Sequence, residues 1–289
     1  MQQPVTRRQS SSVGELSVKD IQLLVLDIDG TIAGQSNEIR EPVKKAVKAV
    51  QAKGIQVAIA TGRTYQSALR FYQDLGATLP LMVYQGALIK DPITATIHRH
   101  WTVPQSLAAE LLDYFEQPAL RSQLSVHFYI NDQLYVREMT RETEDYLSRS
   151  TISAIAVGDL RTTLHQEPTK VLALAEDVDL IDTLLMNLRQ KYLPTDLYLT
   201  KSVATFFEAT HPLVNKGTAV QYLAEEYLKL QPDNVMVVGD NFNDLEMIQY
   251  AGIGVAMGNA PDGVKAVANW IAPDVEMDGV AGAIEEFLL

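Results

Sequence analysis

Short apolar runs alternate with longer segments of helical spacing in the first quarter of the chain. The runs 21–27, 55–61 and 79–86 are mostly apolar and end in polar or turn-forming residues, which is typical of strands buried on both faces. The segments 41–54 and 64–76 lie between them and have the length and the terminal glycines of helices. This alternation predicts a parallel sheet with helices on both sides.

The last quarter of the chain repeats the pattern. It begins near Asn215 and reaches the C-terminus without a low-complexity linker. We expect helices at 216–230, 244–252, 260–268 and 280–289, and strands at 234–240 and 253–258.

The middle of the chain is different. Residues 125–136 alternate around an Asn-Asp pair, as in an antiparallel hairpin, and 169–175 and 197–209 are rich in strand-forming residues. The sequence therefore predicts an α/β fold with a doubly wound parallel-sheet (Rossmann-like) core and an inserted α/β domain. We expect a polar, disordered tail at 1–18, the core at 19–86 and 210–289, and the insert at 87–209.

Composition narrows the classes of function. The chain has 289 residues, 47% of them hydrophobic, and a net charge of -12, so we expect neither nucleic acid nor an anionic membrane surface as a partner. It has no cysteine, which excludes disulfides and thiolate chemistry. No apolar run is long enough for a secretory signal or a membrane span, and we expect a cytoplasmic protein. Composition leaves the oligomeric state open.

Polar residues that could carry chemistry follow the predicted strands. Asp27 and Asp29 end the first, Thr61 and Gly62 follow the second, and "GDNFND" (239–244) follows the strand at 234–240. Ligands of open parallel sheets bind beyond the carboxyl ends of the strands, so these clusters would converge on one site. Each cluster taken singly is as well explained by a helix cap or a turn.

The residue types indicate the chemistry of such a site. Asp27 and Asp29 could share a cation, or divide the roles of nucleophile and acid. Asp240, Asn243 and Asp244 offer oxygen ligands with no histidine nearby, which favours Mg²⁺ over zinc, and they lack the ligand spacing of an EF-hand.

Two further clusters offer groups that could hold an anion. Lys216 at a helix start could neutralise phosphoryl charge, and the loop at Thr61 and Gly62 could hold an anion's oxygens. A role for Arg63 stays open, and so does one for His127 in the predicted hairpin, although a satisfied or exposed histidine is the simpler interpretation.

The ordered set of motifs resembles a known family. "DIDGT" (27–31), "TGR" (61–63), "NKG" (215–217) and "GDNFND" (239–244) are similar, in order, to the four signatures of the haloacid dehalogenase superfamily of phosphohydrolases. Their spacing resembles its Cof-type branch, in which an α/β cap is inserted between the second and third motifs, and "AGIGVAMGNA" and "DGVAGAIEEFL" are also similar to that branch. One departure is Gln85, where the family commonly has asparagine before glycine.

The resemblance implies a phosphatase that forms an aspartyl-phosphate. Asp27 would be the nucleophile and Asp29 the acid and base, and Mg²⁺ would be held by Asp27, the Asp29 carbonyl and Asp240. The remaining roles follow the same motifs: Thr61, Gly62 and Asn243 would hold phosphoryl oxygens, Lys216 would offset charge, and Asp244 would orient Lys216 or metal-bound water.

The substrate implied by the resemblance is a small phosphorylated metabolite, such as a sugar phosphate or a phosphorylated cofactor. A phosphomutase and a dedicated sugar-phosphate phosphatase of a neighbouring branch are alternatives within the fold. A non-catalytic binding protein is a third alternative, which the presence of every motif acid disfavours.

Overall fold

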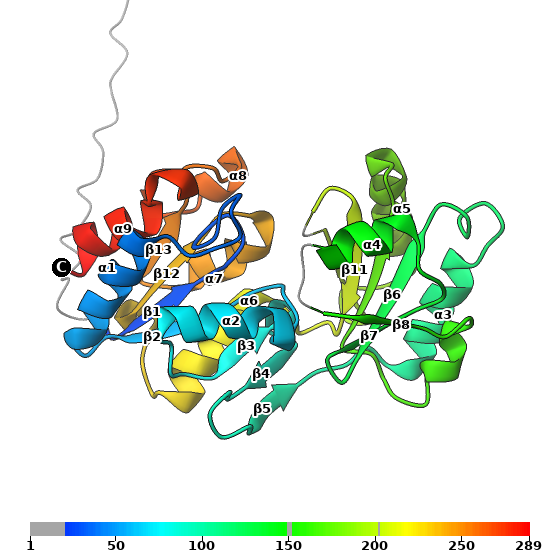
Figure 1. Ribbon diagram of the computed structural model, residues 1–289, viewed down its shortest axis with the longest axis horizontal. Helices are drawn as coiled ribbons and strands as arrows, with labels where there is room; N and C mark the ends of the chain where they lie inside the picture. The colour runs from blue at the N-terminus through cyan, green and yellow to red at the C-terminus, as the bar shows by residue number, and fades with distance from the viewer. Residues whose placement is uncertain (1–20, 149–151, 202) are drawn as a thin grey trace, which may run out of the picture.

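The structure is a computed structural model that describes residues 21–148, 152–201 and 203–289. The predicted tail at 1–18 lies outside these residues. Two bodies stand side by side in Figure 1, one built from both ends of the chain and the other from its middle. Among the described residues, no helix is long and apolar enough to cross a membrane.

The first body is built on a five-stranded parallel sheet. Its strand order is β14-β13-β12-β1-β2, so the β1–α1–β2 unit extends the sheet in one direction and the C-terminal strands extend it in the other. The strands are β1 (Leu23–Leu26), β2 (Gln56–Ile59), β12 (Val235–Gly239), β13 (Ile253–Ala256) and β14 (Trp270–Ile271).

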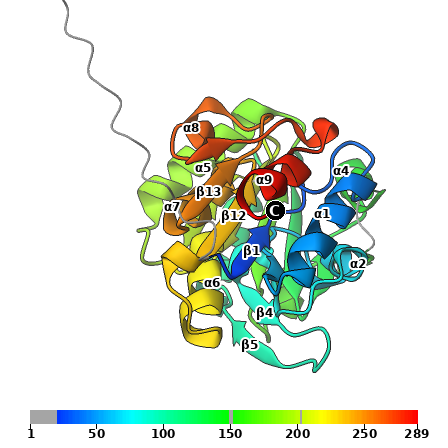
Figure 2. The ribbon, with the colours of Figure 1, turned by 90° about the vertical axis from the view of Figure 1, so that its left-hand side faces the viewer.

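Helices cover both faces of this sheet, because alternate side chains of a strand point to opposite faces. Leu24 and Leu26 of β1 pack in the cluster that also holds residues of α1, α2 and α9, whereas Leu23 and Val25 pack with residues of α6, α7 and α8. Figure 2 shows the sheet between these two layers. The helices are α1 (Glu41–Ala52), α2 (Tyr65–Leu75), α6 (Lys216–Gln221), α7 (Leu245–Tyr250), α8 (Asp262–Lys265) and α9 (Gly279–Phe287).

The third apolar run of the sequence does not simply extend the parallel sheet. Its strand β3 (Leu81–Val83) is joined to the parallel sheet by an isolated parallel bridge between Met82 and Ala60, the residue after β2, and it pairs antiparallel with β4 (Leu88–Lys90). Strand β5 (Ile97–His100) completes this three-stranded sheet. The chain reverses after β3 because Tyr84 and Gln85 have left-handed backbones, with φ of 53° and 60°, ahead of Gly86.

The second body has a six-stranded mixed sheet in the order β10-β11-β9-β6-β7-β8. Its centre is the antiparallel hairpin expected at 125–136. The strands are β6 (Ser125–Ile130), β7 (Gln133–Val136), β8 (Ala154–Ala156), β9 (Lys170–Leu174), β10 (Tyr198–Thr200) and β11 (Phe206–Thr210). The mixed α/β character of the middle segment is thus confirmed.

The two faces of this sheet have different partners. Apolar residues of α3 (Gln105–Phe115) and α5 (Val178–Lys191) pack with one face. On the other face, residues of α4 (Arg141–Ser148) join Tyr129 and Leu172 in a cluster that continues through Tyr84 into the first body. The second body is therefore attached to the first by a shared apolar cluster as well as by the chain.

Candidate active site

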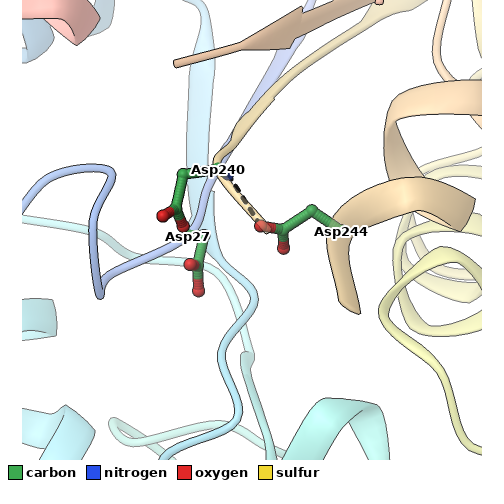
Figure 3. A group of neighbouring side chains, drawn as sticks. All are labelled: Asp27, Asp240 and Asp244. Atoms are coloured by element: carbon green, nitrogen blue, oxygen red, sulfur yellow. Dashed lines mark hydrogen bonds between the residues drawn. The ribbon is translucent and has the colours of Figure 1, made fainter. Parts of the chain in front are cut away.

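Strand register gathers the predicted site residues at one edge of the parallel sheet. Leu26 of β1 lies opposite Val238 of β12 and Ile59 of β2, so the residues that follow these strands leave the sheet together. Asp27 and Asp240 come from the ends of adjacent strands, and Asp244 comes from the turn before α7 (Figure 3). The carboxyl ends of β1 and β12, where the direction of sheet growth reverses, form this edge.

Lys216 and two carboxylates form a buried ionic cluster. The Lys216 ammonium lies 2.7 Å from Asp27 Oδ1 and donates a 2.6 Å hydrogen bond to Asp244 Oδ1. All three side chains are at most 5% exposed. The second oxygen of Asp244 accepts hydrogen bonds from the backbone N–H groups of Asp240 and Asn241, at 2.8 and 3.0 Å. Asp244 therefore fixes both Lys216 and the loop after β12.

Asp240 lies on the other side of Asp27. Asn259 Nδ2 donates to Asp240 Oδ2 at 3.2 Å and to the Gly30 carbonyl at 2.9 Å, which links this loop to the loop after β1. Gly30 has a φ of 76°, and a Cβ at this position would lie 2.1 Å from Asp240 Oδ2. Only glycine lets the turn after β1 approach Asp240 this closely.

The cluster has more negative than positive charge. Burial raises the pKa of Asp27 well above its usual value, the nearby Lys216 ammonium opposes this, and Asp244, Asp240 and Asp29 raise it further. Burial, followed by repulsion from Asp244, raises the pKa of Asp240 to about 7. Burial alone would lower the pKa of Lys216, but Asp244 and Asp27 outweigh it and raise that pKa. A further cation would relieve this imbalance.

The donor set fits a hard divalent cation. Asp27, Asp240 and Asp244 each offer a carboxylate oxygen, and these atoms lie within 4.8 Å of one another (Figure 3). Oxygen ligands of this kind suit Mg²⁺. Because Asp244 is occupied by Lys216 and two backbone amides, Asp27 and Asp240 are the better candidates for ligands.

Asp29 is held by Arg63, the residue whose role the sequence left open. Arg63 Nε donates to Asp29 Oδ2 at 2.9 Å and Nη2 donates to Oδ1 at 2.5 Å, while Nη2 also donates to Asn37 Oδ1 at 2.6 Å. The Arg63 side chain is 14% exposed and that of Asp29 is 62% exposed. The bidentate pair fixes the Asp29 carboxylate at the edge of the site.

The predicted anion-binding residues lie beside the cluster, though not all face the same way. Gly62 and Asn243 line the cavity described next. Thr61 is fully buried, and its hydroxyl accepts a 3.2 Å hydrogen bond from the Arg63 N–H within the loop. Asn243 Nδ2 donates to Gln85 Oε1 at 3.1 Å.

A cavity of about 410 Å³ opens above the cluster and is lined by residues of both bodies. Its floor includes Asp27, Asp29 and Asp240, and its other wall comes from the second body. That wall carries four carboxylates, one ammonium and several apolar side chains: Glu142, Asp145, Glu176 and Glu208, then Lys170, then Tyr146, Leu174, Val203 and Phe206.

Sequence reasoning missed several of these residues. Lys170 and Glu208 form a buried pair, with Nζ 3.4 Å from Oε1, and come from adjacent antiparallel strands of the second body. Their only signal was a charge inside an apolar strand. Asn259 lies in a stretch noted for its resemblance to the Cof-type branch, but its role as a link between loops needs the folded chain.

Comparisons with known proteins agree with this geometry. Residues 24–284 match the model of a protein family described as haloacid dehalogenase-like hydrolase. The chain is similar to the 5-amino-6-(5-phospho-D-ribitylamino)uracil phosphatase YitU of Bacillus subtilis, with 30% identity over 92% of this chain and 97% of that protein. It is also similar to a Haemophilus influenzae protein named "Putative phosphatase", with 28% identity over 90% of this chain and 95% of that protein.

Solved structures share the fold. A haloacid dehalogenase-like hydrolase from Bacteroides thetaiotaomicron superimposes with a TM-score of 0.82 at 24% identity, over 92% of this chain and 99% of the other. The likeness thus spans both bodies of the structure.

Proposed function

The chain belongs to the haloacid dehalogenase-like hydrolases and is a phosphatase, and we propose that it uses Mg²⁺ and an aspartyl-phosphate intermediate to hydrolyse a small phosphorylated metabolite. The observation that carries the proposal is the position of Asp27. Its carboxylate lies 2.7 Å from the Lys216 ammonium, beside Asp240, on the floor of the cavity. A nucleophile, a fixed cation and metal-ligand oxygens are therefore within reach of one phosphoryl group.

In the first step, an Asp27 oxygen attacks phosphorus and the bond to the ester oxygen breaks. Asp29 gives a proton to the leaving oxygen. For this, the Asp29 carboxyl group must leave its contact with Arg63 and contact the substrate instead. Lys216 and the N–H groups near Gly62 offset charge on the phosphoryl oxygens, with Thr61 and Asn243 as further donors. Splitting hydrolysis into two displacements lowers the barrier of each.

In the second step, Asp29 removes a proton from water, the water oxygen attacks phosphorus, and the bond to Asp27 breaks. Phosphate and the free carboxylate of Asp27 result. Asp27, Asp240 and the Asp29 carbonyl would hold Mg²⁺, with Asp244 positioning Lys216. When bound, the ion would supply positive charge for the phosphoryl oxygens.

We propose that residues 87–209 form a cap domain over the site. The side chains that this domain contributes to the cavity wall bear on the choice of substrate. The four carboxylates of this wall outnumber its one ammonium, which is paired with Glu208, so the wall can accept hydrogen bonds from hydroxyl or amino groups and would repel a second anion. This favours a phosphorylated polyol or amino compound over a bisphosphate, and it disfavours a phosphomutase that needs a bisphosphate activator. Because a relative is named for 5-amino-6-(5-phospho-D-ribitylamino)uracil, we propose this compound as the first to assay, together with sugar phosphates, flavin mononucleotide and pyridoxal phosphate.

Asp27→Asn tests the proposed function. The substitution keeps the shape of the side chain but removes the nucleophile, so we expect phosphate release to fall by about 10³-fold or more. Turnover of the ester panel, with MgCl₂ and with EDTA, measures the change, and Asp74→Asn on the exposed face of α2 serves as the matched control. Wild-type turnover by the Asp27 variant would contradict the mechanism, and full activity in EDTA would contradict the role of the metal.

A further inference from the structure

Gln85 lies at the junction of the loops that the proposed mechanism uses, although no motif assigns it a role. It is 2% exposed and lines the cavity together with Gly62, Asp27 and Asn243. Its backbone N–H donates to the Thr61 carbonyl at 3.0 Å. The residue thus connects the loop after β2 to the turn after β3.

The backbone of Gln85 is held in a costly conformation. Both Tyr84 and Gln85 have left-handed backbones, with φ of 53° and 60°, a region that non-glycine residues seldom adopt. Such conformations persist where surrounding contacts impose them, and they are concentrated at functional sites. The effect of this backbone is to turn the Gln85 side chain into the cavity.

The two ends of the Gln85 amide differ in their partners. Oε1 accepts the 3.1 Å hydrogen bond from Asn243 Nδ2, whereas Nε2, like Oδ1 of Asn243, is buried and has no hydrogen-bond partner within the described part of the chain. A Cβ on Gly62 would lie 2.5 Å from Nε2, so this amide packs directly against the glycine of the anion-binding loop. A buried donor without an acceptor is costly and uncommon, which indicates that an acceptor arrives with a ligand.

We propose that Gln85 is a substrate-binding residue whose Nε2 group donates a hydrogen bond to a phosphoryl oxygen, while its Oε1 holds Asn243 in place. The inference rests on the proposed function because it assumes that the phosphoryl group lies above Asp27. It adds a donor on the side of the group that faces Gly62. Glutamine reaches one methylene further than the asparagine common in the family, and Gly62 provides the space.

Binding of inorganic phosphate tests the inference without turnover. We compare wild type, Gln85→Met and the control Gln73→Met, an exposed position of α2, by calorimetric titration at fixed MgCl₂. Gln85→Met removes a hydrogen bond to a charged acceptor, so we expect its phosphate affinity to be about 10- to 100-fold weaker than that of wild type. We expect no change for the control. Phosphate affinity within twofold of wild type in a folded Gln85→Met variant would overturn the inference.

A second variant and a double-mutant cycle with Asn243 show whether Gln85 contacts phosphate itself or only positions Asn243. Gln85→Glu keeps the oxygen that holds Asn243 but loses the donor, so it should also lose phosphate affinity, and undiminished affinity would refute the contact. In an Asn243→Ala background, Gln85→Met should weaken phosphate binding again, because the Nε2 contact is independent of Asn243. No further loss in that background would show that Gln85 acts only through Asn243.

Failure of this inference and failure of the proposed function give different results. If wild type hydrolyses phosphate esters and Gln85→Met binds phosphate normally, only the inference is wrong. If Asp27→Asn retains turnover while Gln85→Met loses phosphate, only the mechanism is wrong.

Discussion

At the scale of single residues, Lys216 is a fully buried lysine surrounded by acids. Its ammonium contacts Asp27 and Asp244, and Asp240 lies close by. Removing one partner of a buried ionic group leaves the other charges uncompensated. This lowers the stability of the fold more than replacing the whole group by apolar side chains would. The same cation that serves the proposed chemistry therefore also stabilises the folded chain.

Lys216→Met should lower the free energy of unfolding by about 3–5 kcal/mol in EDTA, because the buried carboxylates of Asp27 and Asp244 lose their cation. MgCl₂ should narrow the gap to wild type, since a bound divalent cation would replace part of the lost charge. Urea denaturation with and without MgCl₂ measures both effects, and Lys45→Met on the exposed face of α1 is the control. Equal stability of Lys216→Met and wild type in EDTA would contradict the role of this lysine.

The residue types of the site were readable from the sequence, whereas their partners were not. Asp27, Lys216 and Asp240 follow apolar strands or open a helix, and parallel strands place such residues at one edge whatever the loops do. The pair between Arg63 and Asp29 and the contact of Gln85 with Asn243 depend on loop conformations that no periodicity encodes. Left-handed backbones at Tyr84 and Gln85 decide the second of these, and non-glycine residues give little warning of them.

At the scale of elements, one contact joins the hairpin of the second body to a helix of the first. Asp132, in the turn between β6 and β7, accepts hydrogen bonds from the Tyr65 and Gln66 N–H groups at 2.8 and 2.9 Å and from the Tyr84 hydroxyl at 2.7 Å. Thr64 caps the same helix from within, accepting from the Ser67 N–H. The first turn of α2 thus takes its second cap from a residue that is distant in sequence.

Asp132→Ala should therefore loosen the start of α2. Loss of a cap corresponds to about 1–2 kcal/mol of the free energy of unfolding, and amide hydrogen exchange should accelerate at Tyr65 and Gln66 in particular. Urea denaturation and exchange measured by mass spectrometry test this, with Asp74→Ala at the other end of α2 as the control. Unchanged exchange of the α2 peptide in the Asp132 variant would show that the contact does not hold the helix.

The elements of the core followed from apolar periodicity, and the exception is instructive. Helices α1 and α2 and strands β1 and β2 lie within their expected segments. Strand β3 was expected as another strand of the parallel sheet, yet most of its pairing is antiparallel to β4. Periodicity reports that a run is buried but not which strand it pairs with, and the turn at Tyr84 sets the pairing here.

At the scale of the whole molecule, the site is complete only where the two bodies meet. The chain leaves the first body after β5 and returns before α6, so the cavity is closed by residues more than a hundred positions from Asp27 in sequence. The apolar cluster that runs from Tyr84 to Tyr129, with ring centroids 5.6 Å apart, fixes how the bodies sit. Local sequence patterns do not indicate which side chains of the two bodies touch. The sequence therefore predicted an inserted domain but not its orientation on the core.

His127, which the sequence left open, belongs to the interior of the second body. It is fully buried, and its Nε2 lies 2.9 Å from the Thr143 hydroxyl. Burial, with a smaller contribution from Lys170, lowers the pKa of His127 to about 3. In the unfolded chain the same group titrates near 6.5. Between pH 6.5 and about 3, His127 is therefore protonated in the unfolded state but neutral in the folded state.

The consequence is a loss of stability as the pH falls from about 6.5 towards about 3, at up to about 1.4 kcal/mol per pH unit for this one group. Asp240 acts in the opposite direction, since its pKa is raised to about 7 and the folded state binds that proton first. Only a difference between variants isolates the histidine. His127→Gln keeps a side chain able to reach Thr143 but cannot titrate, so its free energy of unfolding, measured in urea from pH 7.5 to 4.5, should gain on that of wild type as the pH falls below about 6.5. If the two proteins lost stability in parallel as the pH fell, His127 would have the same pKa in the folded and unfolded states, and its burial would not exclude the charged form.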